Sequence, residues 1–521
     1  MKKWLLLFLL LPFVAFTQQM DMDLVPYKSS FSHFFQPQEQ SYSLDTLNTG
    51  YSTLQYHSFS SKGQLIKVNH QQFVTDYILF NINFDKFSQE GIFNRENLKL
   101  HNVNTNLLFN NKSQTYSAQL SLAYQKISSN ENGGLLNYAT TNFDDPLLYQ
   151  VNLLNAQNEA KNRNHKLIQK FKLTDKLSII NKFSILSHRK MYSDQLPNAS
   201  FYHNIYLDST LTYDSLSTIA LTNSFGVTYN DFTLSQLIHH RHTHINTIDS
   251  LDYDYGLSLN YYNDKKGLRF NSELYQSDDL NLSLKKEFNL KLSNHTLSLD
   301  YDRSRVPILI NSYSSNHFRF NNDFNNIKTT KATYVVKHKN YSFKSSLILY
   351  SDYIYLDENS HYQQYQNAII NWHNKWAVNL NWKKFHTTQT LEYQYTDNTS
   401  ILRFPEFNYT TSLWLESDLF GDNLNTRIGA DINYFTSYYA KAYNPALAKF
   451  HLQDSQLIGD VPLLSAFIKL KVHNMSIAMR YRNITSLISA NADVHYLIPY
   501  YPNYPASFQL SVVWKLNNTS D

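Results

Sequence analysis

The sequence predicts an all-β protein, a transmembrane antiparallel β-barrel of the outer membrane with about 20 strands (18–22). Three observations predict this fold class. From about residue 50 to the end, segments of about 10 residues alternate apolar and polar side chains. Short polar turns alternate with much longer links. The apolar faces carry Tyr, Phe or Trp near the strand ends, where a membrane interface favours them.

The composition fits this fold and excludes several other classes. Aromatic residues make up 15% of the 521 residues, while charged residues make up only 17%. The chain has no cysteine, which excludes disulfides, thiolate metal sites and a lipidated cysteine. The net charge of +4 is too small to indicate nucleic-acid binding. No apolar run after the N-terminus approaches the length of a membrane-spanning helix.

The N-terminus has the features of an export signal. Lys2 and Lys3 form a basic start, Trp4 to Phe13 form an apolar stretch, and cleavage before Gln18 fits the small residues there. We therefore expect residues 1–17 to be a signal peptide. Residues 18–49 are polar and irregular, and we expect a periplasmic or lumenal segment. An uncleaved membrane anchor is the alternative, although the apolar stretch is short for a span.

Residues 50–521 are expected to form the barrel with long extracellular loops. In Asp252–Tyr261 the Tyr and Leu side chains occupy every second position, opposite Asp, Gly, Ser and Asn. Leu464–Val472 and Trp376–Trp382 alternate in the same way. Near the C-terminus the apolar positions are Phe508, Leu510, Val512 and Trp514, which we expect to form the last strand and the membrane-assembly signal.

The lengths of the connections predict which strand ends lie at the short-turn side of the membrane and which lie at the long-loop side. Short turns are expected near Asn110–Lys112, Thr174–Lys176, Asn230–Asp231, Asn263–Gly267, Ser293–His295, Lys337–Asn340, His373–Lys375, Gly421–Asn423 and His473–Asn474. The largest links are expected at about 128–163, 192–218, 306–316, 397–407, 441–461 and 486–506. Short turns at one side and long loops at the other are typical of outer-membrane barrels.

A secreted protein made of β-sandwiches would also alternate, and three features argue against it. The polar faces of the predicted strands carry Ser, Asn, Thr and Gln, whereas a solvent-exposed sheet is usually richer in Lys and Glu. Aromatic pairs such as Tyr253 with Tyr261 mark both strand ends. Long edge strands would expose the protein to aggregation, which closure into a barrel removes.

The stretch from about Gly50 to Leu136 resembles the family of putative porins of Bacteroidota-type outer membranes. The resemblance rests on SKGQLIKVN at Ser61–Asn69, ILFNINFDKFSQEGIF at Ile78–Phe93 and ENGGL at Glu131–Leu135. The chain has Phe84 and Phe93 where that family usually has Tyr. The resemblance implies the barrel architecture and does not supply a transported substrate.

The most specific candidate for chemistry in the lumen is a basic wall. Lys469, Lys471, Arg480 and Arg482 would lie on the inward faces of two adjacent strands and could favour anions. The alternative is that these are ordinary lumenal charges, each paired with an acidic residue on another strand. Acidic residues that could pair in this way include Asp252, Asp254, Asp300 and Glu392.

The run His239–His244 places His240, His242 and His244 on one face of a strand. Alternate residues stand about 7 Å apart, which is awkward for three ligands of one ion, so we expect no metal site. The acid pairs Asp144–Asp145 and Asp278–Asp279 fall in expected loops and could bind a divalent cation, although solvated carboxylates are the default. We find no hydrolase, zincin or Walker signature and expect neither an enzyme nor a cofactor. A barrel lipid hydrolase with dispersed Ser and His would show no such motif.

These observations favour a porin-like channel for passive passage of small solutes. The expected partners are outer-membrane lipid and lipopolysaccharide, the barrel-assembly machinery and small solutes, and nucleic acid is not among them. Only about 30 residues separate the expected signal from the first strand, which argues against a transporter with a plug domain. The alternative is an occluded barrel, with loops filling the lumen, that serves surface assembly, secretion or adhesion.

Overall fold

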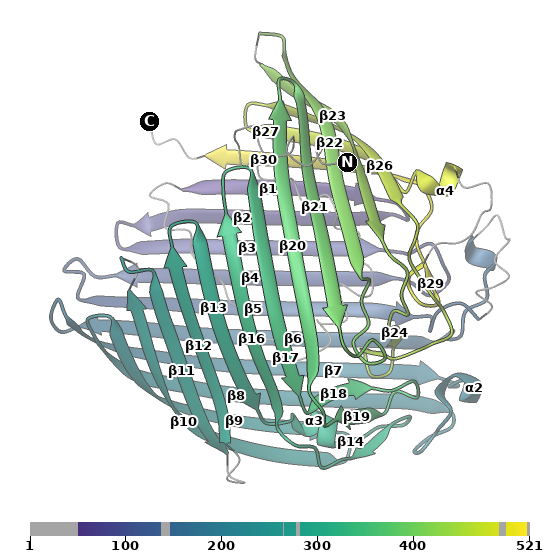
Figure 1. Cartoon of the computed structure of the whole chain (residues 1–521). Coiled ribbons are helices and arrows are strands. Elements are labelled where there is room, and N and C mark those ends of the chain that lie inside the picture. The colour runs from purple at the N-terminus through teal and green to yellow at the C-terminus, as the bar shows by residue number, and fades with distance from the viewer. Residues whose placement is uncertain are drawn as a thin grey trace, which may run out of the picture.

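The computed structural model closes one antiparallel sheet of 22 strands into a barrel (Figure 1). It describes residues 50–136, 146–263, 265–277, 282–421, 423–488 and 496–517. The barrel closes where β1 (Tyr51–Phe59) pairs with β30 (Ser507–Asn517), with Leu54 opposite Trp514. The fold class is therefore confirmed, with 22 strands rather than about 20, at the upper limit of the predicted range.

Each remaining barrel strand pairs with the next one along the chain. These strands are β2 (Gly63–Thr75), β3 (Ile78–Gln89), β4 (Leu98–Asn110), β5 (Tyr116–Glu131), β6 (Ala156–Lys172), β7 (Leu177–Gln195), β8 (Leu211–Tyr229), β9 (Phe232–Ile245), β10 (Ile248–Asn263), β11 (Leu268–Ser277), β12 (Leu282–Leu292), β13 (His295–Ser304), β16 (Ile327–Lys337), β17 (Tyr341–Ser351), β20 (Ile369–Trp382), β21 (Phe385–Thr396), β22 (Phe407–Leu419), β23 (Leu424–Phe435), β26 (Leu463–Val472) and β27 (Met475–Arg482).

The alternation of the sequence decides which side chains face out. Tyr255, Leu257 and Leu259 on β10 are 55%, 57% and 41% exposed, because they face the space that lipid occupies in a membrane. Their neighbours Ser258 and Asp254 lie on the inner face, and Ser258 is buried. Cross-strand partners share a face, so the registers assign every strand consistently.

The two ends of the barrel differ, as predicted. The turns at one end are short, such as 230–231, 293–294 and 473–474, while 132–155, 305–326 and 436–462 link strands at the other. The predicted turn at His373–Lys375 is wrong, because these residues lie inside β20 and the turn is at 383–384. His373 and Lys375 instead face the lumen, 3.1 and 2.8 Å from the Glu392 carboxylate.

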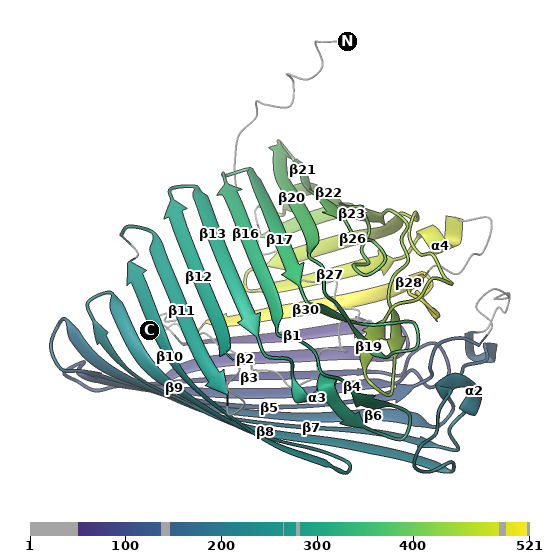
Figure 2. The same cartoon turned by 60° about the horizontal axis from the view of Figure 1, so that its bottom comes forward.

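Four small hairpins are built into the long links and lie at the long-loop end (Figure 2). They are β14 (Ser312–Ser314) with β15 (Arg319–Asn321), β18 (Tyr353–Leu356) with β19 (Tyr362–Tyr365), β24 (Ala442–Asn444) with β25 (Lys449–His451), and β28 (Tyr496–Ile498) with β29 (Tyr501–Pro502). The link 352–368 was not predicted as a long loop, because its two strands continue the alternating pattern. Short helical segments are η2 (Pro146–Leu148), α2 (Ala199–Tyr202), α3 (Ile308–Asn311) and α4 (Thr485–Ile488).

Several predictions fall outside the described residues. These are the signal peptide at 1–17, the segment at 18–49 and the acid pairs Asp144–Asp145 and Asp278–Asp279. Within the part of the chain that the structure describes, no helix has the length and hydrophobicity needed to cross a membrane.

Candidate functional site

The inner face of β2–β6 is lined by amide side chains. Asn81 donates to Asn69 over 3.1 Å and accepts from Asn83 over 2.8 Å, so these amides form a chain across β2 and β3. Asn162 on β6 donates to Gln125 on β5 over 2.9 Å. The Oδ1 atoms of Asn104 and Asn106 find no hydrogen-bond partner among the described residues. These amides are neutral donors and acceptors on a face that also carries Lys67, Asp85, Lys166 and Lys170, and they can bind hydroxyl and amide groups of a solute.

Above this amide wall, the inner face turns apolar and the hairpins of the long loops dock there. Phe59, Leu65, Phe87, Leu98, Ile127 and Ala160 face inward near the long-loop ends of β1–β6 and are almost fully buried. Tyr443, Ala448, Ile498 and Tyr501 from the hairpins β24–β25 and β28–β29 cover them. The loops therefore fold into the barrel mouth, and we call these two hairpins and their contacts the docked loops.

The ENGGL stretch is part of this docking. Gly133 and Gly134 have φ values of +67° and +81°, which side chains rarely adopt. A Cβ on Gly134 would lie 2.7 Å from the Cβ of Tyr500, so the backbone approach there requires glycine. Leu135 donates its N–H to the Tyr500 carbonyl over 2.9 Å. The motif thus fastens the loop after β5 to the loop before β30.

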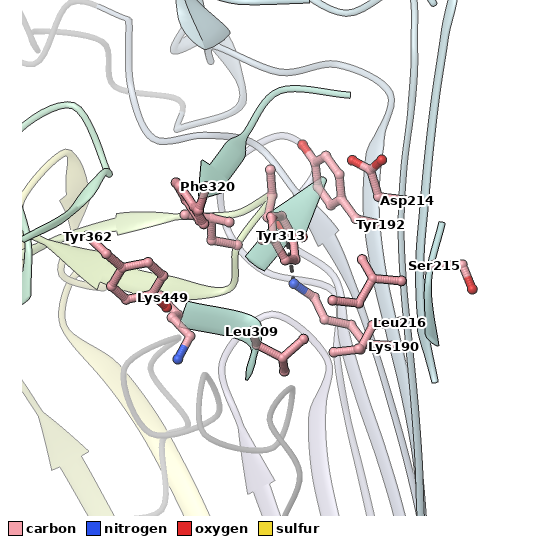
Figure 3. A pocket seen from close by; sticks show the side chains of 13 residues that line it. Lys190, Tyr192, Asp214, Ser215, Leu216, Leu309, Tyr313, Phe320, Tyr362 and Lys449 are labelled. Carbon is pink, nitrogen blue, oxygen red and sulfur yellow. Dashed lines mark hydrogen bonds between the residues drawn. The ribbon is translucent and has the colours of Figure 1, made fainter. Parts of the chain in front are cut away.

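A small cavity lies between the wall and the hairpins β14–β15, β18–β19 and β24–β25 (Figure 3). Lys190 from β7 and Asp214 from β8 project into it from the wall, opposite Tyr313, Tyr362 and Lys449 of the hairpins. Its free volume of about 40 Å³ holds a few waters and no larger solute. Lys190 is 6% exposed as a residue, and its ammonium donates to the Ala446 carbonyl over 2.9 Å. On the neighbouring strand β6, Asn158 donates to the Pro445 carbonyl over 2.7 Å.

Asn316 and His317 fasten the loop after β13 to the loop after β7. Asn316 accepts from the N–H groups of Leu207 and Asp208, both over 2.9 Å. The ring of His317 stacks on Tyr202 with centroids 3.6 Å apart, and its nitrogens lie 2.7 Å from the Thr212 hydroxyl and 3.0 Å from the Asn204 carbonyl. Burial lowers the pKa of His317 below its ordinary value of 6.5, although the Asn204 carbonyl acts in the opposite direction.

We expect the loops to loosen in acid. Burial also lowers the pKa of His451 in the β24–β25 hairpin, so both imidazoles are held neutral while the loops are docked. Well above the ordinary imidazole pKa of 6.5, the docked and undocked forms bind the same number of protons, and the docking free energy does not change with pH. As the pH falls further, only the undocked loops bind the protons, and docking weakens.

Trypsin cleavage of the loops measured from about pH 7.5 to about pH 5.5, corrected for trypsin's own pH dependence, checks this expectation. Replacing both residues, His317→Asn with His451→Gln, should remove the slope. A wild-type cleavage rate that is flat over this range contradicts the prediction.

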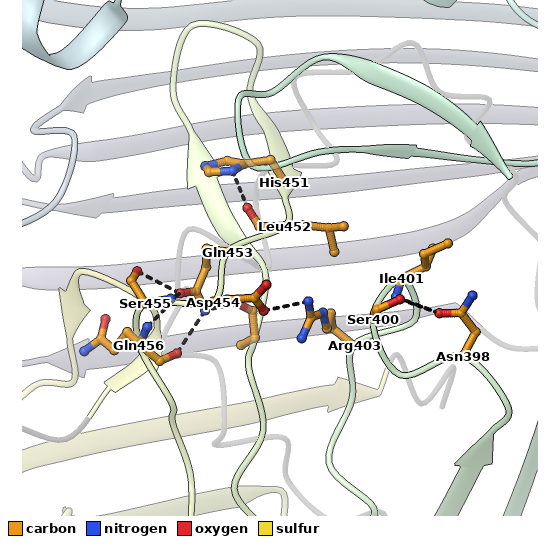
Figure 4. Close-up of polar contacts among 11 residues, drawn as sticks. Asn398, Ser400, Ile401, Arg403, His451, Leu452, Gln453, Asp454, Ser455 and Gln456 are labelled. Atoms are coloured by element: carbon orange, nitrogen blue, oxygen red, sulfur yellow. Dashed lines mark hydrogen bonds and ion pairs between the residues drawn. The ribbon is translucent and has the colours of Figure 1, made fainter.

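A second contact ties two long loops together over the mouth (Figure 4). The Arg403 guanidinium in the link 397–406 lies 2.7 Å from the Asp454 carboxylate in the link 436–462. The carboxamide of Gln453 donates to the carbonyls of Ala440 and Gln456 over 2.6 and 2.9 Å and shapes this turn from within. The link 436–462 is therefore held by the ion pair between Arg403 and Asp454 and by the packing of Tyr443 and Ala448 on the barrel wall.

The structure places Lys469, Lys471, Arg480 and Arg482 on the inner faces of β26 and β27, as the alternation predicted. The registers set Lys469 opposite Ala478 and Arg480 opposite Phe467. The Arg480 guanidinium is only 4% exposed and lies 2.7 Å from the Asp431 carboxylate on β23. Its neutralising acid is therefore Asp431, which was not among the candidates, because pairing across β26 depends on register that the sequence pattern does not contain.

The predicted last strand is in place. Phe508, Leu510, Val512 and Trp514 share the outer face of β30, with Phe508 and Trp514 55% and 47% exposed. His240, His242 and His244 also share the outer face, where His242 lies 2.5 Å from Asp249 and His240 stacks on Tyr253. Among the described residues, no group of three or more potential ligands is arranged to hold a metal ion.

Comparison with known proteins covers nearly the whole chain. A family model described as "Putative porin" matches residues 12–518, and no curated protein matches the chain. Among solved structures, the siderophore receptor PirA from Acinetobacter baumannii is 9% identical, with a TM-score of 0.62 over 91% of this chain and 81% of that one. The ferric-catecholate import receptor Fiu from E. coli K12 is 13% identical, with a TM-score of 0.59 over 91% and 83%. At these identities the likeness shows the fold, a large outer-membrane barrel.

Proposed function

This chain belongs to the putative porin family of outer-membrane barrels, and from that premise we propose that it conducts small polar solutes passively across the outer membrane. The single observation that carries the proposal is the amide-lined inner face of β2–β6. Lipid requires an apolar outer face but sets no demand on the inner one. Neutral amides such as Asn81, Asn83 and Gln125 suit uncharged solutes with many hydroxyl groups, which exchange hydrogen bonds with the wall as they pass.

The docked loops favour a second candidate, an occluded barrel that serves surface assembly, secretion or adhesion. Barrels of 16–18 strands leave an aqueous channel, whereas 22-stranded transporters have a plugged lumen. Here the loops cover the inner faces of β1–β6 at the mouth. We propose that they narrow the entrance and set the size of the solute, and the occluded barrel is the outcome if nothing passes.

The test measures both passage and conductance. The refolded full-length chain is placed in liposomes, and swelling is followed with neutral sugars of increasing size. Single-channel conductance is recorded in planar bilayers, with heat-modifiable migration on a gel to show that the barrel is folded. Passage of small sugars and exclusion of larger ones would support the proposal. If the folded, inserted protein gives neither liposome swelling nor single-channel conductance, the channel is rejected and the occluded barrel is favoured.

Ion selectivity should depend on Asp431 more than on the basic wall itself. Asp431→Asn removes the carboxylate 2.7 Å from Arg480, so the inner face of β26–β27 gains uncompensated positive charge. We expect a several-fold increase in the chloride-to-potassium permeability ratio, measured as a reversal potential in a salt gradient. Arg480→Gln is the matched control, and it should shift selectivity towards cations. Equal reversal potentials for wild type and both variants would contradict this arrangement of charge.

A further inference from the structure

A row of cations crosses five adjacent strands on the outer face of the barrel. The registers place Lys86 on β3 opposite His101 on β4, His101 opposite Lys126 on β5, and Lys126 opposite Lys161 on β6. Lys161 is in turn opposite Arg189 on β7. Lys99 and Arg163 face the same way beside this row. Because neighbouring strands are about 4.8 Å apart, the row is about 19 Å wide.

The row follows the outer margin of the apolar band. On β3, β4 and β5 the cation or imidazole is the next outward residue beside the last apolar outward side chain, which is Phe84, Val103 and Tyr124 respectively. From these apolar residues, further apolar outward positions on each strand run towards the short-turn end. The cations therefore lie at the level where the headgroups of the outer leaflet begin.

The longest run of directly opposed cations lies on this side of the barrel, while Lys286, Arg303 and Lys328 face outward on β12, β13 and β16. On β1, β2, β17, β20–β23, β26, β27 and β30, the outward positions of the described strands carry no Lys, Arg, Asp or Glu. Those strands reach the same margin with uncharged outward residues such as Tyr56, Trp372 and Phe508. A merely solvated rim would carry charge all round, so the run across the adjacent strands β3–β7, whose place in the barrel Figure 1 shows, needs its own cause.

The protein neutralises only part of the row. Glu159 is the one carboxylate on the outward faces of β3–β7, and it lies 2.8 Å from Lys126 and 2.7 Å from Lys161. Lys86, Lys99 and Arg189 form no ion pair within the described residues. Like charges directly opposite each other on neighbouring strands are destabilising, so an anion bound between them would stabilise the wall.

We propose that this row, Lys86–Lys126–Lys161–Arg189 with Lys99 and Arg163, is a binding site for the phosphorylated headgroup of lipopolysaccharide. The apolar residues below it contact the acyl chains, and the cations pair with the phosphates above them. The site goes beyond passage through the lumen and does not depend on it, because it lies on the opposite face of the wall.

The test compares two triple variants of the purified full-length chain in detergent, with lipopolysaccharide as the probe. The site variant is Lys86→Gln, Lys99→Gln and Arg189→Gln, three of the four cations of the site that form no ion pair within the described residues. The matched control is Lys166→Gln, Lys170→Gln and Lys182→Gln, three cations on the inner faces of β6 and β7. We expect the site variant to bind about 100-fold more weakly and the control to bind as wild type does. Charge-conserving Lys86→Arg with Lys99→Arg should keep the affinity.

Several outcomes would overturn the site. A folded site variant that binds as wild type does, or equal binding of dephosphorylated lipopolysaccharide, rejects phosphate recognition. Displacement by low concentrations of inorganic phosphate would identify a free anion as the ligand. Equal affinity for phosphatidylglycerol vesicles would reduce the site to a general negative-surface contact, and an acidic protein that co-purifies only with wild type would make it a protein-docking surface. If the triple variant does not fold, the exposed Lys86→Gln alone should still weaken binding by about fivefold.

Discussion

Excision of residues 439–457 is expected to raise the single-channel conductance by about tenfold or more, because a 22-stranded barrel encloses a wide lumen. This segment carries the β24–β25 hairpin, whose Tyr443 and Ala448 cover the inward-facing apolar patch of the wall. The flanking residues Tyr438 and Ile458 already lie opposite each other, with the Tyr438 N–H donating to the Ile458 carbonyl over 2.9 Å. An Asn-Gly turn can therefore join them without moving β23 or β26.

The control for this excision keeps the hairpin. Leu457→Ser changes a 54% exposed residue of the same link, outside the docked contacts, and should leave the conductance unchanged. Larger sugars should also enter liposomes that contain the excised protein. If the folded, excised barrel conducts no better than wild type, the hairpin does not restrict the mouth.

The substitution Ile127→Asp is expected to detach the docked loops while the barrel stays closed. Ile127 is fully buried between Phe87, Ala160 and the hairpin residue Tyr443. An unpaired carboxylate there costs several kcal/mol, and undocking the hairpin hydrates it at less cost than opening the strand ladders. The closed ladders of β5 with β4 and β6 remain intact.

Limited trypsin digestion measures the detachment, since Lys441 directly precedes this hairpin and Lys449 lies in it. We expect cleavage there to accelerate about 100-fold or more in Ile127→Asp, because several kcal/mol shift the population of the undocked state by that factor. Ile127→Val, which removes one methyl group at a cost of about 1 kcal/mol, should accelerate it only several-fold. Cleavage at the wild-type rate in a folded Ile127→Asp protein would show that the patch does not hold the loops.

Much of the fold could be predicted from local pattern. The alternation in Asp252–Tyr261 and in Phe508–Trp514 fixed the outward faces, because side chains of successive strand residues point to opposite sides. Most of the turns were found as well. The turn at His373–Lys375 was misplaced because polar residues on an inward face resemble a turn when the strand's partners are unknown.

The inward apolar patch could not be predicted. Phe59, Phe87 and Ile127 break the rule that inward residues are polar, and their reason is a contact with Tyr443 and Tyr501, more than 300 residues further along the chain. The amide wall was visible as abundant Asn, but its hydrogen bonds join neighbouring strands and depend on register. The cation row of β3–β7 also depends on the register between strands, since each strand contributes only one or two of its cations.

The sequence by itself determined that this chain is an outer-membrane barrel with a polar inside, because period-two alternation is a local property of each strand. The tertiary structure decided the strand number of 22, the docking of the loops and the partner of Arg480. These depend on which strands lie side by side and in what register, and hydrogen-bond ladders and packing between distant segments set that register.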